Sequence, residues 1–343
     1  MGAIIALLDG AADESIPALA DKTPLEAARK PFIDRLASSG LVGYTGTYLH
    51  THQFLTDLLA EGDRVSRGIL EALALGIPLR EGMIVYRLSP ARISRGSIRL
   101  EYALPIEELQ NLESLADKML SLLSDLDPRI YFNGGRGVLI LKRACFKPAP
   151  TSPFEDNPLE ALPKILQDFV SRIALRNSGL TLIPWGGGLY KKPNLRPRTK
   201  KLSILSNSPA VCGLAKVLNL KAYKIRNLDD LPNQAQKLLE SENEYLLIHF
   251  EQPDEESHRR SYTGKVLAIE KIDRLLEELY SKTGAGILLV IDHAASSITG
   301  RHFRAKTPFL YAEKPAEEKS RSFHEKILGR FVPADKLLSL ISR

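Results

Sequence analysis

The chain has 343 residues, of which 44% are hydrophobic and 26% are charged. This length and this hydrophobic fraction exclude a disulfide-stabilised mini-protein and a disordered tail, and they favour about two domains with ordinary cores. The formal net charge of +6 is too small to indicate DNA or a membrane surface as a partner, and the two cysteines form no repeated metal-binding spacing.

The first residues have the pattern of a β-strand rather than that of a signal peptide. Residues 3–8 are apolar, the run ends at Asp9 and Gly10, and no basic region precedes it. The chain contains no stretch of about 18 apolar residues, so we expect no membrane span. Together these features predict a cytoplasmic protein.

The next elements alternate between helix and strand. A capping-box signature at Thr23 and Glu26 predicts a helix that runs to Gly40. A strand is expected over 41–44 and a helix over 67–76. With the first strand, these elements indicate the beginning of an α/β domain.

The middle of the chain has the pattern of a small α+β unit. The expected strands cover 84–88, 97–102, 129–133, 137–142 and 180–184, and the expected helices cover 106–124 and 159–176. We therefore predict that residues 77–190 form an inserted α+β domain, which serves as a substrate or lid domain.

From residue 202 the alternation of strands and helices resumes. Strands are expected over 202–205, 221–225, 245–250 and 286–291, and helices over 209–218, 229–241 and 262–282. Such alternation is typical of a mainly parallel sheet with helices on both faces. The predicted fold is an α/β domain of residues 1–76 and 191–343, with the α+β domain inserted.

Polar side chains follow three of the expected strands. They are Asp9 after the first strand, Asp254 and His258 after 245–250, and Asp292, His293 and His302 after 286–291. Ligands gather beyond the carboxyl ends of parallel strands, and carboxylate with imidazole suits Zn²⁺ or Mn²⁺-like ions. Each residue alone also fits an ordinary turn, a solvated acidic loop or a surface histidine.

The joint pattern resembles the archaeal-type cofactor-independent phosphoglycerate mutases of the alkaline phosphatase superfamily. The matching stretches are Leu8-Asp9-Gly10, residues 22–28, 34–36 and 67–73, His249-Phe250 with Asp254 and His258, residues 272–274, Asp292-His293 and His302. The resemblance covers most of both ends of the chain and the middle more faintly. It implies an alkaline-phosphatase-like fold for the α/β domain.

The resemblance also implies a metal-dependent phosphotransferase. Asp254, His258 and His302 would hold one divalent ion, with Mn²⁺ or Zn²⁺ expected, and a second ion would have the ligands Asp9, Asp292 and His293. A serine of the family accepts the phosphoryl group of phosphoglycerate at the 3-position and returns it at the 2-position, without added bisphosphoglycerate. A small phosphorylated substrate is therefore implied for this chain, whereas its oligomeric state is left open.

The segment that carries the family's serine differs in this chain. Residues 44–53 contain no serine, and with one gap Gly46-Thr47 aligns with the family's Gly-Ser pair. Thr47 is thus the expected nucleophile, and His52 aligns with a family histidine near the substrate. The alternative is that Thr47 is an ordinary loop residue and the nucleophile is lost.

The arginines that bind the substrate in the family are mostly absent from this chain. Residues 100–105 contain no arginine where the family has several. Arg67 and Arg136 remain as expected substrate-binding residues, since guanidinium groups recognise phosphate and carboxylate in a bidentate way. Three hypotheses therefore stay open, namely a mutase, a phosphohydrolase or phosphotransferase for another phosphoester, and an impaired paralogue that acts as a binding module.

Positive charge is concentrated in one stretch of the chain. Residues 191–226 carry ten lysines and arginines and no acidic residue. Few aromatic residues lie nearby, which disfavours nucleic acid as a partner and favours a solvated face or a rim that attracts a phosphorylated substrate.

Overall fold

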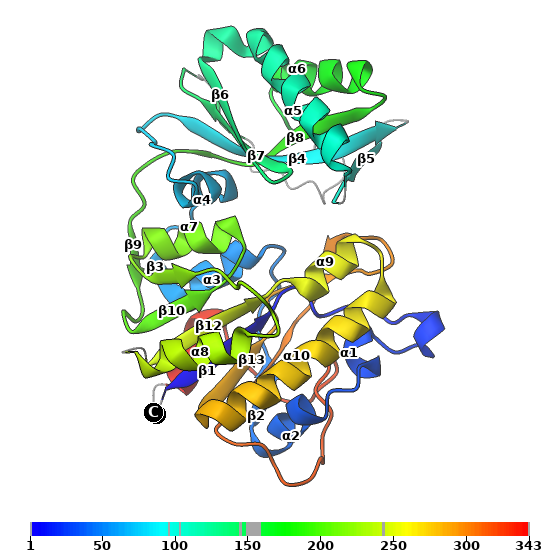
Figure 1. The fold of residues 1–343 in the computed structure, drawn as a ribbon, viewed down its shortest axis with the longest axis vertical. Helices are drawn as coiled ribbons and strands as arrows, with labels where there is room; N and C mark the ends of the chain where they lie inside the picture. The colour runs from blue at the N-terminus through cyan, green and yellow to red at the C-terminus, as the bar shows by residue number, and fades with distance from the viewer. Residues whose placement is uncertain are drawn as a thin grey trace. The chain divides into compact units, whose positions relative to one another are not determined.

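The chain divides into two units, Met1–Gly62 with Leu195–Arg343 and Asp63–Asn194, which are drawn in Figure 1. The structure, a computed structural model, describes residues 2–94, 97–102, 104–143, 146–148, 159–241 and 244–341. Among these described residues, no helix combines the length and the apolar character that crossing a membrane requires.

The first unit contains an eight-stranded sheet with the order β11-β10-β12-β1-β13-β16-β2-β17. Its strands are β1 (Ala3–Leu8), β2 (Leu41–Tyr44), β10 (Leu202–Leu205), β11 (Lys221–Tyr223), β12 (Tyr245–Phe250), β13 (Gly286–Val290), β16 (Pro308–Ala312) and β17 (Arg330–Phe331). The first five strands in this order are parallel, whereas β16 pairs antiparallel with both of its neighbours. This confirms the expected mainly parallel sheet.

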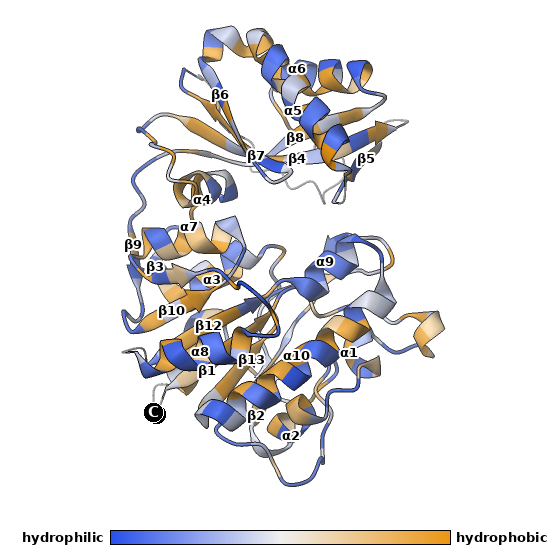
Figure 2. Ribbon diagram, viewed as in Figure 1, coloured by the Kyte–Doolittle hydropathy of each residue, from blue (hydrophilic) through white to orange (hydrophobic). Residues whose placement is uncertain are grey.

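Helices cover both faces of this sheet. They are α1 (Pro24–Ala27), α2 (Pro31–Ser39), α3 (Thr51–Leu59), α7 (Pro209–Val217), α8 (Leu231–Glu240), α9 (Gln252–His258), α10 (Tyr262–Thr283) and α11 (Ala334–Leu337). Apolar residues of α2, α8 and α10 pack with Ile4 and Ala6 of β1 in one core cluster. Ile5 and Leu7 point to the opposite face and are also fully buried. The striping of α8 and α10 in Figure 2 reflects this one-sided burial.

The expected helix from Thr23 to Gly40 is divided into α1 and α2. The capping box of Thr23 and Glu26 is present at the start of α1, but Pro31 starts a new helix, because proline lacks the N–H that a continuous helix needs. Asp273 of α10 accepts hydrogen bonds from the first turn of α2, at 2.7 Å from the nitrogen of Ile33. A carboxylate far along the chain thus caps α2.

The second unit is a five-stranded antiparallel sheet with three α-helices in the described residues. Its elements are α4 (Arg67–Ala74), β4 (Ile84–Ser94), β5 (Ser97–Leu100), α5 (Ile106–Met119), β6 (Pro128–Asn133), β7 (Arg136–Leu141), α6 (Lys164–Arg176) and β8 (Leu180–Leu189). Residues of α5 and α6 share a core with one face of the sheet, and α4 lies against the other face (Figure 1). The sequence placed α4 in the first domain, but its packing on β4 and β8 assigns it to the second unit.

Short elements complete the first unit. They are β3 (Ala60–Gly62), β9 (Leu195–Pro197), β14 (Ala294–Ala295), β15 (His302–Phe303) and the 3₁₀ helices Pro17–Leu19 and Leu338–Leu340, with a third 3₁₀ helix, Leu120–Leu126, in the second unit. The antiparallel pairing of β14 with β15 places Ala295 opposite His302. This pairing brings His302 back toward the end of β13.

Candidate metal centre

The candidate ligands lie where the central parallel strands end. In the parallel register Leu8 of β1 pairs with Phe250 of β12, and Leu7 pairs with Val290 of β13. The segments that begin with Asp9, Glu251 and Ile291 therefore leave the sheet at one edge. All six residues expected as metal ligands lie in the first unit, beyond this edge.

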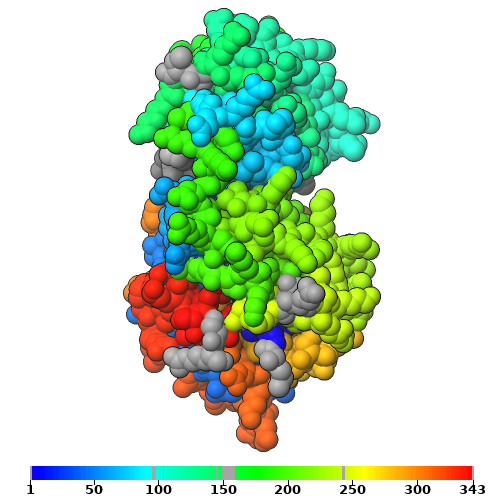
Figure 3. Space-filling model, turned by 90° about the vertical axis from the view of Figure 1, so that its left-hand side faces the viewer, coloured from blue at the N-terminus to red at the C-terminus, as the bar shows by residue number. Residues whose placement is uncertain are grey.

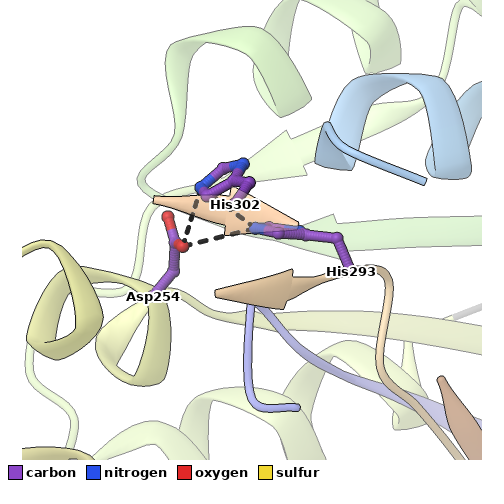
Figure 4. Close-up of side chains that lie close together, drawn as sticks. All are labelled: Asp254, His293 and His302. Atoms are coloured by element: carbon purple, nitrogen blue, oxygen red, sulfur yellow. Dashed lines mark hydrogen bonds and ion pairs between the residues drawn. The ribbon is translucent and has the colours of Figure 1, made fainter. Parts of the chain in front are cut away.

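Asp254, His293 and His302 form the first group of candidate ligands, shown in Figure 4. Oδ1 of Asp254 lies 3.3 Å from Nε2 of His293 and 3.2 Å from Nε2 of His302. His258 is one helical turn after Asp254 in α9, and its Nε2 atom lies 3.1 Å from Oδ2 of Asp254. Three imidazoles and one carboxylate thus converge on one point.

The hydrogen bonds of two imidazoles show which ring atoms hold lone pairs. Nδ1 of His258 donates to the backbone oxygen of Gly300 at 2.9 Å, and Nδ1 of His302 donates to that of Leu49 at 2.6 Å. Because a carbonyl oxygen only accepts, the Nδ1 atom of each ring carries a proton, which leaves Nε2 as the atom that can offer a lone pair to a metal ion. These two Nε2 atoms face each other at 3.3 Å. A metal ion that accepts both lone pairs fits this arrangement.

The second group consists of Asp9, Asp292 and His293. Nδ1 of His293 lies 2.8 Å from Oδ2 of Asp292 and 3.5 Å from Oδ1 of Asp9. Burial, together with repulsion from Asp292 and Asp254, raises the pKa of Asp9 to about 7. Buried carboxylates that repel one another in this way provide the negative charge that a divalent cation neutralises, so this group also fits a metal ion.

His293 belongs to both groups. Burial alone would lower the pKa of His293, but Asp292 and Asp254 attract its charged form and hold that pKa well above the usual value. The pKa of His302 is instead lowered to about 4, by burial and by repulsion from His293. A cation bound here would replace the proton that His293 shares with the carboxylates.

Thr51 is the hydroxyl group that the structure brings to these ligands. Oγ1 of Thr51 donates to Oδ1 of Asp9 at 2.9 Å in a buried hydrogen bond. Thr51 is also the first residue of α3, so its hydroxyl lies at the positive end of the helix dipole. The expected nucleophile Thr47 is instead exposed, in the irregular segment before α3.

The sequence analysis pointed to Thr47 and did not identify Thr51, which lies four residues later at the start of α3. A hydroxyl residue that starts a helix is the signal that would have identified Thr51.

His249 and Ser206 form a hydrogen-bonded chain behind Asp9. Nε2 of His249 lies 2.9 Å from Oδ2 of Asp9, and its Nδ1 atom lies 2.9 Å from Oγ of Ser206. Attraction to Asp9 outweighs the burial that would lower the pKa of His249, and raises it to about 9. A histidine within an otherwise apolar strand is the sequence signal for this role, and it was noted only as part of the family match.

Two further histidines flank Thr51. The ring of His50 lies 6.0 Å from that of His302 and 5.6 Å from that of His52, measured between centroids. His52, which the sequence assigned to substrate binding, is buried in the first turn of α3. The structure therefore places it in the same segment as Thr51.

Arg67 and Arg136 belong to the second unit. Arg67 of α4 forms an ion pair with Glu71 at 2.9 Å, and its guanidinium carbon lies 5.0 Å from the centre of the Trp185 ring. The half-buried Arg136 begins β7, and its charge acts on Glu71 and on the buried Arg87. Three arginines thus surround one carboxylate, and Arg87 is the member that the sequence did not identify.

The basic stretch 191–226 is partly neutralised. Arg198 pairs with Glu61 at 3.0 Å, and Lys201 pairs with Glu244. Residues near position 200 lie in the green part of the face in Figure 3. These pairs agree with a solvated face, which is the interpretation that the sequence favoured over a nucleic-acid site.

Known proteins support the resemblance that the sequence predicted. A family model described as the Metalloenzyme superfamily matches residues 216–338, which include five of the six expected ligands. The chain is 24% identical to 2,3-bisphosphoglycerate-independent phosphoglycerate mutase 2 of Methanocaldococcus jannaschii, over 92% of this chain and 85% of that protein. The corresponding mutase of Methanopyrus kandleri is 25% identical, over 88% and 85%.

Solved structures support the fold. The PH0037 protein from Pyrococcus horikoshii shares it with a TM-score of 0.67 at 19% identity, over 99% of this chain and 96% of that one. The cofactor-independent phosphoglycerate mutase from Thermoplasma acidophilum gives 0.55 at 20% identity, over 99% and 98%. The predicted α/β class and the predicted relationship to an enzyme family are confirmed. Over most of its length the chain is thus similar to archaeal cofactor-independent phosphoglycerate mutases.

Proposed function

We propose that the protein is a metal-dependent phosphoglycerate mutase that interconverts 3- and 2-phosphoglycerate through a phosphorylated Thr51. The observation that carries the proposal is the 2.9 Å hydrogen bond from Thr51 to Asp9, within a cluster of carboxylates and imidazoles. The relatives that match most of the chain are named as mutases of this kind. Thr51 takes the place in the mechanism that the sequence assigned to Thr47.

The proposed metal ligands are the six residues identified from the sequence. Asp254, His258 and His302 would hold one divalent ion, Mn²⁺ or Zn²⁺, and Asp9, Asp292 and His293 the other. Two such ions would lower the pKa of a nearby hydroxyl and neutralise the charge of the transferred phosphoryl group. No added bisphosphoglycerate is needed, because the phosphoryl group is held by the protein between the two half-reactions.

The chain's own groups orient the acceptor. Oδ1 of Asp9 accepts the hydrogen bond of Thr51 and so orients Oγ1 of Thr51. His249 holds Oδ2 of Asp9 in place. In the first half-reaction a bond forms between Oγ1 of Thr51 and phosphorus, the bond between phosphorus and the 3-oxygen of the substrate breaks, and the proton that Thr51 loses ends on the 3-oxygen. In the second half-reaction the 2-oxygen attacks phosphorus, the bond to Oγ1 breaks, and the proton of the 2-hydroxyl ends on Thr51. The N-terminus of α3 stabilises the phosphorylated side chain.

The test measures phosphoryl transfer in the purified chain. We expect ³¹P NMR to show 2-phosphoglycerate forming from 3-phosphoglycerate after chelation and reloading with Mn²⁺, and mass spectrometry to detect phosphate on the peptide that contains Thr51. T51A should lower kcat by more than about 1,000-fold, whereas T51S should keep a measurable rate.

T47A is the matched control, since Thr47 lies in the same segment and is exposed. Its rate should stay within about twofold of that of the wild type. Activity that survives in T51A and disappears in T47A would overturn the assignment of Thr51. Release of inorganic phosphate without formation of 2-phosphoglycerate would identify a phosphohydrolase instead.

A further inference from the structure

Lys265 of α10 is completely buried close to the candidate metal centre. Its Nζ atom donates three hydrogen bonds, to Asp13 Oδ2 at 2.9 Å and to the backbone oxygens of Ala12 and Ala295 at 3.2 and 2.7 Å. An ammonium group has three donors, so its hydrogen-bonding capacity is fully used. Neither Lys265 nor Asp13 is among the candidate ligands.

Asp13 extends the contacts of Lys265 into the loop after β13. Its Oδ2 atom accepts hydrogen bonds from the backbone nitrogen and the hydroxyl of Ser297, at 3.1 and 2.7 Å. The side chain of Asp13 is also completely buried. Lys265, Asp13 and Ser297 therefore join two loops that are far apart in the sequence.

Each of these loops carries candidate metal ligands. Ala12 and Asp13 follow Asp9 by a few residues, and Ala295 and Ser297 similarly follow Asp292 and His293. The backbone of Ala295 donates to that of Ala12 at 3.0 Å, so the loops are already in contact.

The contacts of Lys265 reach the other ligands as well. Ala295, whose carbonyl accepts from Lys265, pairs with His302 in the β14–β15 ladder. Lys265 itself lies in the first turn of α10, and α10 packs against α9, which carries Asp254 and His258. The ammonium group thus bonds to the loops after β1 and β13, and the helix that carries it packs against the helix that supplies Asp254 and His258.

We propose that Lys265 and Asp13 are positioning residues that hold the ligand-bearing loops in the geometry required for metal binding, without contacting the metal. The proposal rests on the proposed metal centre. Loss of this buried ion pair should weaken metal binding by more than the accompanying loss of unfolding free energy explains. Interactions behind the ligands that orient them change metal affinity by about 10–100-fold when they are removed.

The matched control is a second buried lysine–aspartate pair in the same unit. Nζ of Lys30 lies 3.4 Å from Oδ1 of Asp34, and the side chains are 1% and 3% exposed. This pair connects α2 to Ser322 and Phe323, and within the described part of the chain it has no hydrogen bond to a ligand-bearing loop. K265M leaves Asp13 as a buried charge, whereas Asp34 keeps an ion pair with Lys319 in K30M. The unfolding free energy of each variant is therefore measured beside its Mn²⁺ affinity.

The experiment measures Mn²⁺ binding by calorimetry in the full chain, below the unfolding temperature of each variant. We expect K265M to bind Mn²⁺ at least about tenfold more weakly than the wild type, and K30M to remain within about twofold. S297A, which removes one donor and keeps the ion pair, should show a smaller weakening and serves if K265M does not fold.

Hydrogen exchange in the metal-free chain provides a readout that does not depend on the metal. Exchange over residues 9–14 and 292–302 should accelerate in K265M or S297A and stay unchanged in K30M. Equal Mn²⁺ affinity in wild type, K265M and S297A would overturn the positioning role alone. A wild-type chain that binds no Mn²⁺ would overturn the proposed metal centre and this inference with it.

Discussion

Gly10 packs so closely against Asp254 that a Cβ atom on Gly10 would lie 2.6 Å from Oδ1 of Asp254. Gly10 also has a φ of +58°, and its backbone nitrogen donates to Oδ1 of Asp292 at 3.1 Å. Position 10 therefore requires glycine for two reasons. Its backbone has a left-handed conformation, and Asp254 occupies the space that a side chain would need.

G10A should displace Asp254 and weaken Mn²⁺ binding by about tenfold or more. The control is G284A, because Gly284 has a φ of +59° and nothing within 4 Å of its Cβ position. Both variants should lose about 1–2 kcal/mol of unfolding free energy from the strained backbone, measured by denaturant unfolding. If the two variants bound Mn²⁺ equally well, the proposed crowding of Asp254 would be refuted.

S206A should reduce the mutase rate by about tenfold, because His249 loses the partner that holds its ring toward Asp9. The control is S203A, because Ser203 is a buried serine of β10, which pairs with β12, the strand that carries His249. The measurement compares kcat and the unfolding free energy of both variants. A rate loss in S203A as large as that in S206A would show that packing of β10, rather than orientation of His249, limits the rate.

The free energy of unfolding should depend on pH through the ionisation of Glu71. Burial would raise the pKa of Glu71, but attraction to Arg87 and Arg67 outweighs it, so the pKa lies below its usual 4.5. A carboxyl group with a lowered pKa in the folded state stabilises the protein above pH 4.5, and that contribution disappears as the pH falls through the lowered value. E71Q leaves the buried Arg87 and the partly exposed Arg67 without their partner.

E71Q should therefore cost about 3–5 kcal/mol of unfolding free energy at pH 7, and less as the pH is lowered below about 4.5. Urea unfolding at several pH values measures this difference. E61Q is the control, since Glu61 forms an ion pair with Arg198 while its side chain is 68% exposed, and such a pair contributes about 0–1 kcal/mol. A pH-independent cost of E71Q would contradict the assigned ionisation of Glu71.

The family resemblance assigns Arg136 to substrate binding, and on that proposal R136A should raise the KM for phosphoglycerate by about tenfold and change kcat little, because ground-state and transition-state binding would weaken alike. R129A, an exposed arginine of the neighbouring strand β6, tests whether loss of one positive charge is sufficient. Equal KM values for R136A and R129A would remove Arg136 from substrate recognition.

The sequence predicted that the candidate ligands lie close together, but it did not point to Thr51, and the reason is geometric. Asp9, Asp292 and His293 directly follow strands of one parallel sheet, so the strand ends alone bring them together. The position of Thr51 depends on where an irregular segment ends and α3 begins, and hydrophobic periodicity does not indicate that boundary.

Two other features of the fold could not be predicted from local pattern. The α4 helix belongs to the second unit because of its packing on β4 and β8, and its own residues do not show that partner. Similarly, the break before Pro31 separates α1 from α2, and the cap on α2 comes from Asp273, more than two hundred residues away. The expected roles of the individual ligands remain predictions that the metal-binding experiments test.

The two short strands β3 and β9 place Gly62 opposite Leu195. The chain therefore leaves the first unit and returns to it at adjacent positions, and residues 63–194 form one very long hairpin connection. Replacing that connection by a two-residue turn would keep every strand of the eight-stranded sheet in order. A different insert could therefore be attached at Gly62 and Leu195 without changing the strand order of the first unit.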